Sequence, residues 1–187
     1  MSTRSCLALV LLATAIAGCG SQAHSDAPAQ SSVQAAFKDS PAPLAALHAQ
    51  ANQLLGGGAT AFKARLRALR GYPVIVNMWA SWCEPCQSEF PVYQRIAVQY
   101  GRRVAFLAVD VQDTNSNAAS FLRHFPVTYP SYTDPHGRIA GSVGSDAQYM
   151  PQTWYFNSRG SMLYDKDGPY LSVNDFKRDI AFYLHVK

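Results

Sequence analysis

The sequence VNMWASWCEPC, residues 76–86, contains two cysteines, Cys83 and Cys86, with two residues between them. It continues an apolar run that starts at Val74, so the cysteines follow a predicted buried strand and begin a predicted helix. The unpaired N–H groups at a helix N-terminus carry partial positive charge, which stabilises a thiolate on Cys83. Cys86 lies one turn further along, where it can attack a mixed disulfide formed by Cys83. The pattern therefore predicts a centre for thiol–disulfide exchange.

Three other uses of the cysteine pair compete with this interpretation: a structural disulfide, half of a zinc site, and two inert buried thiols. A zinc site needs about two more ligands. The sequence has no second C-x-x-C, and its histidines are scattered without ligand spacing at positions 24, 48, 124, 136 and 185. A structural bridge across so short a loop gains little chain entropy. We therefore expect redox chemistry and no metal.

The N-terminus has the features of an export signal. Arg4 supplies a positive charge, and residues 6–17 are apolar or small over a stretch too short to span a membrane. The following Ile16-Ala17-Gly18-Cys19 resembles the bacterial lipoprotein box. The resemblance implies a signal peptide over residues 1–18, a lipid anchor on Cys19, and a place on the extracytoplasmic face of a membrane. The alternative is an ordinary secreted protein in which Cys19 is incidental.

Composition divides the rest of the chain into a tether and one domain. Residues 19–43 are rich in Ser, Ala, Gln and Pro and predict a flexible tether. Residues 44–187 are numerous enough for one domain with a core of its own. The net charge is +4, but the basic residues form no dense run. Arg67 and Arg70 fall on the solvated face of a predicted helix. We therefore expect no nucleic-acid partner.

Periodicity within residues 44–187 predicts helices and strands in alternation. The order is helix, helix, strand, helix, strand, helix, short strand, hairpin and helix. The expected ranges are helices at 44–55, 62–69, 83–100, 116–125 and 172–184, strands at 74–78 and 104–109, and a hairpin over 153–164. This order predicts an α/β fold, with a mixed central sheet flanked by helices and a helical extension at the N-terminus.

Residues 70–186 resemble the thioredoxin fold, and within it the TlpA/ResA-like membrane-tethered thiol–disulfide oxidoreductases. The matching features are Trp82, the C-x-x-C pair, the glutamate three residues after it and the helix proline. Met150-Pro151-Gln-Thr153 resembles the cis-proline loop of the family. The resemblance implies that Cys83 attacks, Cys86 resolves, and Trp82, Met150 and Pro151 contact substrate. It implies no cofactor.

Glu89 matches the acidic residue that ResA-like members carry near the active site. Thioredoxins themselves have a buried aspartate at the position of Asn77, and an amide cannot transfer a proton. Against an apolar wall the pKa of Glu89 should rise, which suits an acid–base group. The alternative is a solvated helix glutamate that takes no part in the chemistry.

The resemblance implies an enzyme that reduces disulfides of exported proteins, as in cytochrome c maturation, with electrons from a membrane partner. The same residues could serve the opposite direction, in an oxidase that forms disulfides. A thioredoxin-fold copper-delivery protein is a more remote alternative, since it uses C-x-x-x-C and a histidine. A peroxidatic enzyme would use one cysteine outside this context. Two departures from the family, helices over residues 44–70 and methionine at Met150, leave the shape of the substrate open.

Overall fold

The computed structural model describes residues 29–187. The predicted signal peptide and the lipoprotein-box residue Cys19 lie outside these residues. Within the described part of the chain, no helix combines the length and the apolar character that a membrane span requires.

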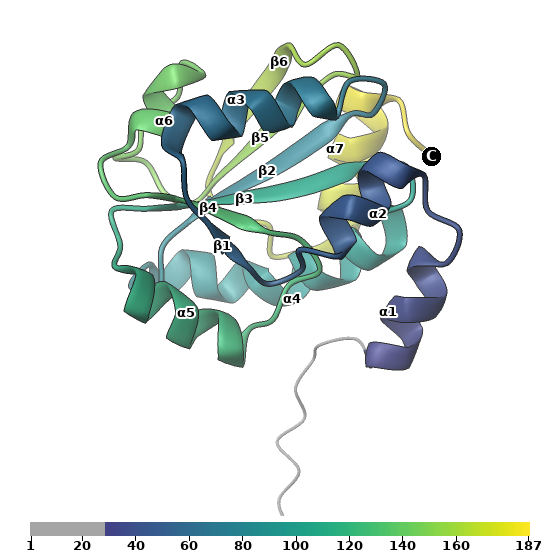
Figure 1. The fold of residues 1–187 in the computed structure, drawn as a ribbon, viewed down its shortest axis with the longest axis horizontal. Helices are drawn as coiled ribbons and strands as arrows, with labels where there is room; N and C mark the ends of the chain where they lie inside the picture. Colours follow the sequence, from purple (N-terminus) through teal and green to yellow (C-terminus); the bar gives the residue numbers. More distant parts are fainter. Residues whose placement is uncertain (1–28) are drawn as a thin grey trace, which may run out of the picture.

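One six-stranded mixed sheet forms the centre of the fold, with strand order β1-β4-β3-β2-β5-β6 (Figure 1). The strands are β1 (Leu54–Leu55), β2 (Val74–Trp79), β3 (Ala105–Val111), β4 (Ser131–Asp134), β5 (Gln152–Phe156) and β6 (Met162–Asp167). The helices are α1 (Gln30–Phe37), α2 (Ala42–His48), α3 (Gly58–Ala68), α4 (Glu84–Tyr100), α5 (Asn115–His124), α6 (Arg138–Ser142) and α7 (Val173–Leu184).

The apolar run before the cysteines forms the central strand, β2. All six of its residues are buried, because helices cover both faces of the sheet. It pairs in parallel with β3 and antiparallel with β5, so the sheet changes from parallel to antiparallel at this strand. The parallel part, the antiparallel hairpin β5–β6 and the flanking helices confirm the predicted mixed α/β architecture.

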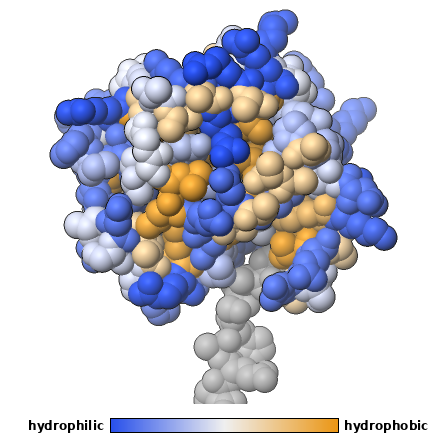
Figure 2. Space-filling model, in the orientation of Figure 1, coloured by the Kyte–Doolittle hydropathy of each residue, from blue (hydrophilic) through white to orange (hydrophobic). Residues whose placement is uncertain are grey.

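Two hydrophobic clusters fill the space between the sheet and its helices. One lies under α4, α5 and α7, and its large members include Trp79, Phe90, Tyr93 and Phe176. The other lies under α2, α3 and α6 and includes Phe62 and Trp154. Figure 1 shows α3 and α6 on one side of the sheet and α4 and α5 on the other. The face in Figure 2 is mainly hydrophilic, with apolar patches between the polar side chains.

The structure corrects the prediction of one helix over residues 44–55. The helix ends at His48, and Leu54–Leu55 form the edge strand β1, parallel to β4. Asn52 explains the break: it has a φ of 62°, its side chain donates to the Leu122 carbonyl, and it accepts from the Val127 N–H. These long-range bonds turn the chain in a way that local periodicity does not record.

Two further helices differ from the sequence-based expectation. The short helix α6 follows the turn at Asp134–Gly137, and the Asp134 carboxylate accepts from the backbone of its first residues. The helix α1 lies within the range predicted as a tether. Phe37 at its end stacks on His48 with 3.6 Å between ring centroids, so this part of the range contacts the domain.

Candidate active site

A disulfide bond joins Cys83 and Cys86 at the start of α4. Cys83 is the N-cap of the helix, and its sulfur accepts a hydrogen bond from the Cys86 N–H at 3.2 Å. The side chain of Cys83 is 5% exposed, whereas that of Cys86 is fully buried. Cys83 is therefore the more accessible of the two sulfurs, and Cys86 lies within the helix.

The predicted substrate-contacting residues lie on two loops at the same end of the sheet. The Met150–Pro151 peptide bond is cis, as predicted, and Pro151 directly precedes β5. Since β5 pairs with β2, with Gln152 opposite Met78, this loop lies beside the strand that leads into the cysteines. Trp82 is 57% exposed, and its indole N–H donates to the Gln112 carbonyl at 3.0 Å. Its exposed ring is available to a partner.

Glu89 is fully buried on the inner side of α4, so it is not the solvated helix glutamate of the alternative interpretation. One carboxylate oxygen accepts from the Tyr170 backbone N–H at 3.1 Å, and the other has no hydrogen-bond partner among the described residues. Burial raises the pKa of Glu89 to about 8, against the opposing effects of the Tyr170 N–H and the positive charge of Lys166. A carboxyl with this pKa can take up and release a proton near neutral pH.

Other buried polar groups surround Glu89. Burial, followed by the charge of Glu89, raises the pKa of Tyr129, and the Asn77 amide opposes both shifts. The Asn77 amide and the Tyr129 hydroxyl are nevertheless without a well-formed hydrogen bond to any described residue. Unpaired polar groups are costly in a protein interior, so packing alone does not explain why they gather around Glu89.

Sequence reasoning missed a second carboxyl group at this end of the sheet. Asp110 is 2% exposed near the end of β3, and the Asp113 carboxylate accepts from the Ser81 N–H at 2.6 Å. Ser81 lies two residues before Cys83. The signal that could have found these residues is their position, because the carboxyl ends of parallel strands meet at one edge of a sheet.

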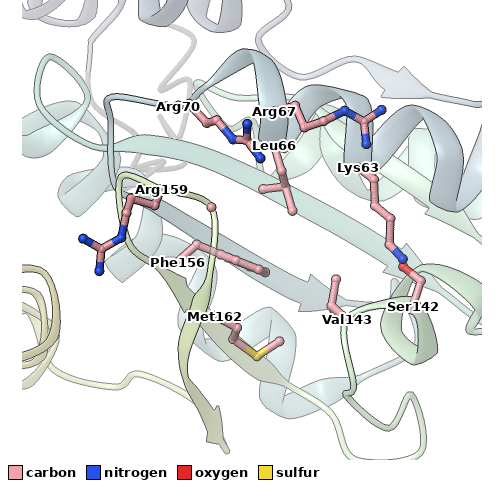
Figure 3. Close-up of a pocket in the computed structure, with 10 residues that line it drawn as sticks. Lys63, Leu66, Arg67, Arg70, Ser142, Val143, Phe156, Arg159 and Met162 are labelled. Atoms are coloured by element: carbon pink, nitrogen blue, oxygen red, sulfur yellow. The ribbon is translucent and has the colours of Figure 1, made fainter.

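Metal ligands do not gather anywhere in residues 29–187: no three or more His, Cys, Asp or Glu side chains are arranged to hold an ion there. A separate cavity of about 340 Å³ lies between α3, the end of α6 and the β5–β6 hairpin (Figure 3). Lys63, Arg67, Arg70 and Arg159 surround it, above an apolar floor that includes Leu66 and Phe156. It contains none of the residues around the disulfide.

Comparison with known proteins places this geometry in a family. Residues 45–168 match the model of the AhpC/TSA family. The thiol:disulfide interchange protein CycY of Rhizobium leguminosarum bv. viciae is 31% identical over 108 residues, covering 57% of this chain and 56% of CycY. The thiol-disulfide oxidoreductase ResA of Bacillus thuringiensis (strain Al Hakam) is 29% identical over 107 residues, with coverage of 57% and 56%. The chain thus spans about half the length of these relatives.

Solved structures support the fold. A putative DsbE from Chlorobium tepidum superposes with a TM-score of 0.55 at 24% identity, covering 61% of this chain and 81% of its own. The exposed lipoprotein thioredoxin Etrx1 of Streptococcus pneumoniae strain TIGR4 gives 0.54 at 18% identity, covering 63% and 89%. The family match, the mixed sheet and the disulfide at the start of α4 agree with one another. The chain belongs to the AhpC/TSA family and has a thioredoxin-like fold.

Proposed function

We propose that this protein is an extracytoplasmic thiol–disulfide oxidoreductase that reduces disulfides of other proteins through Cys83 and Cys86. The observation that carries the proposal is that the disulfide at the start of α4 and a buried carboxyl lie on the same face of that helix. Cys86 and Glu89 lie three residues apart on the buried side of α4, so their side chains share one helix face. The names of the relatives CycY and ResA support the same chemistry.

The reaction begins with the reduced protein. The Cys83 thiolate attacks one sulfur of a substrate disulfide, which forms a mixed disulfide and releases the other substrate sulfur as a thiolate. In the molecules whose Glu89 is ionised, the Cys86 thiol gives its proton to Glu89 and attacks the sulfur of Cys83, which releases the second substrate sulfur. Two electrons have passed to the substrate. Its two thiolates take up one proton returned by Glu89 and one from solvent.

Two features of α4 favour these steps. The helix N-terminus stabilises the negative charge on Cys83, since unpaired N–H groups point toward it. The raised pKa of Glu89, about 8, lies near the ordinary pKa of a thiol, so a proton can pass between Cys86 and Glu89 without a large energy difference. In the opposite direction Glu89 protonates Cys86 as the disulfide opens.

Membrane attachment completes the proposal. The lipoprotein box Ile16–Cys19 supports a lipid anchor at Cys19, which would hold the domain near a membrane electron donor. Replacement of Cys19 by serine should abolish incorporation of a radiolabelled fatty acid in cells. Incorporation that survives Cys19→Ser would overturn the anchor and leave the redox proposal standing.

The reduction potential tests the direction of electron flow. We would equilibrate the Cys19→Ser protein with glutathione and with dithiothreitol, and quantify the Cys83–Cys86 disulfide by alkylation and mass spectrometry. A potential near or below about −250 mV, close to that of thioredoxin, supports a reductant. A potential near about −120 mV, as in strong periplasmic oxidants, would make the protein a disulfide-forming oxidase. Cys86→Ser, which cannot form the disulfide, is the control.

A further inference from the structure

Two aspartates lie near the segment that precedes Cys83: Asp110 on β3, the strand adjacent to β2, and Asp113 in the loop that follows β3. In the sheet, Asp110 of β3 stands opposite Trp79 of β2. Side chains alternate along a strand, so Asp110 shares a face with Phe106 and Ala108, which belong to the hydrophobic cluster that contains both cysteines. The carboxyl therefore points into the layer beneath α4, where it is almost completely buried.

Asp113, three residues later, holds the segment that precedes Cys83. One of its carboxylate oxygens accepts from the Ser81 N–H at 2.6 Å and the other from the Thr114 N–H at 2.7 Å. Two short bonds from N–H donors are typical of an ionised carboxylate, so Asp113 carries the negative charge of the pair. The first of these bonds ties the loop after β3 to the backbone two residues before Cys83.

Gln112 adds a second tie between the same two segments. Its carbonyl accepts from the Trp82 indole, and its φ of 52° lies in the left-handed region that residues other than glycine rarely adopt. Such a conformation is unfavourable for a residue with a side chain and persists where its surroundings require it. Gln112 is thus held in an unfavourable conformation, in a loop that presents the Gln112 carbonyl to the Trp82 indole and the Asp113 carboxylate to the Ser81 N–H.

Asp110 is the protonated member of the pair. Its carboxyl group lies next to that of Asp113, which acts on it electrostatically, and its Oδ1 has no hydrogen-bond partner among the described residues. Its neighbours on the adjacent strands, Trp79 and Thr133, carry no charge, so Asp113 is the charged group that acts on it. Burial first, and then the charge of Asp113, raise the pKa of Asp110 to about 8.

We propose that Asp110 and Asp113 share one proton, and that this pair positions the Ser81–Cys83 segment for thiol–disulfide exchange. With the proton present, the Asp110 O–H donates to Asp113 and leaves both carboxylate oxygens of Asp113 on their N–H donors. Loss of the proton places two negative charges side by side, which weakens the tie to Ser81 and opposes negative charge on Cys83. The pair acts through the loop, so both aspartates are positioning residues. The inference rests on the proposed redox function of Cys83.

The experiment must separate Asp110 from Glu89, because both groups titrate in the same pH region. We would therefore work in a Glu89→Gln background and measure the rate at which dithiothreitol reduces the disulfide between about pH 6 and pH 9, with acid quenching and alkylation. The rate with Asp110→Asn added is divided by the rate without it. The ratio cancels the ionisation of dithiothreitol itself. Asp175→Asn, at an exposed carboxylate on α7, is the matched control.

We expect the ratio to be constant below about pH 7 and to rise roughly threefold by pH 9, the equivalent of half a pKa unit. The reason is that Asp110 ionises in this range and gives the pair a second negative charge, whereas the amide in Asp110→Asn cannot ionise. A ratio that stays constant over the whole range, or one that Asp175→Asn reproduces, would overturn the proposal. If dithiothreitol reduces the disulfide of the Glu89→Gln protein at a measurable rate, the redox centre itself works. A constant ratio then counts against the aspartate pair and leaves the proposed redox function standing.

Carbon-13 NMR of the aspartate carboxyl groups gives a second test that needs no variant of Asp110. In the oxidised Cys19→Ser protein we expect the Asp110 carboxyl to titrate above pH 7 and the Ser81 amide proton to shift over the same range. Titration of Asp110 below about pH 5, near the ordinary range of aspartate, would refute the shared proton. This arm remains decisive if Asp110→Asn fails to fold.

Discussion

Replacing Glu89 by glutamine tests the buried carboxyl directly, because glutamine keeps the shape of the side chain and cannot ionise. The pKa of Glu89 is about 8 in the folded protein, against 4.5 for an unperturbed glutamate. The folded state therefore holds the proton more tightly than the unfolded state. The stabilising contribution of this proton is fully present below pH 4.5, falls as the pH rises, and is lost above about pH 8.

The size of the effect follows from the two pKa values. Between pH 4.5 and pH 7, Glu89 is ionised in the unfolded chain and protonated in the folded chain. Over this range the free energy of unfolding therefore falls by about 1.4 kcal/mol for each pH unit. Raising the pH from 4.5 to 7 thus lowers the free energy of unfolding of the parent protein by about 3 kcal/mol. Glu89→Gln removes this dependence. The variant should match the parent protein near pH 4.5 and exceed its free energy of unfolding by about 3 kcal/mol at pH 7.

Urea unfolding of both oxidised proteins between pH 4.5 and pH 8 measures this difference. Glu84→Gln is the matched control, since Glu84 is an exposed glutamate in the first turn of the same helix. A difference between Glu89→Gln and the parent that does not change with pH would refute the reasoning. It would mean that Glu89 ionises equally in both states, and that it is not the buried acid of the site.

Three further predictions concern the cysteines, the exposed tryptophan and the core. Cys86→Ser should accumulate a mixed disulfide between Cys83 and a substrate protein, detectable on a non-reducing gel, and its absence would contradict Cys83 as the attacking residue. Trp82→Phe removes the indole N–H that donates to Gln112, so the free energy of unfolding in urea should fall by about 1 kcal/mol or less. The same change should raise KM for a protein disulfide, and unchanged kinetics would show that Trp82 does not contact the substrate. Phe62→Ala should lower the free energy of unfolding by about 3–5 kcal/mol with the reduction potential unchanged, and a shifted potential would show that this core is coupled to the redox site.

The elements that the sequence predicts correctly are those with strong local patterns. The run from Val74 to Trp79 is continuous because both of its faces are buried, and the cysteines after it mark a helix start. The Met150–Pro151 loop is recognisable because it resembles a known family loop. The burial of Glu89 also agrees with the expectation of a raised pKa.

The features that escaped prediction depend on contacts between distant parts of the chain. Leu54–Leu55 form a strand only because β4 lies beside them, and Asn52 turns the chain through bonds to Leu122 and Val127. Asp110 and Asp113 look like ordinary polar residues at the end of a strand until the fold brings Asp113 to Ser81. No spacing rule connects residues that meet only through the fold.

The hydrogen bond between Glu89 and the Tyr170 backbone affects the order in which the parts of the active site are synthesised and assembled. Tyr170 lies 81 residues after Glu89 in the chain. At a synthesis rate of about 5–20 residues per second, both cysteines leave the ribosome roughly 4 to 17 s before the residue that anchors Glu89. During that interval Glu89 lacks the backbone N–H that it accepts from in the folded domain. The cysteines and the backbone group that anchors Glu89 are therefore made at different times, and the buried acid of the site is complete only after the segment around Tyr170 has been added.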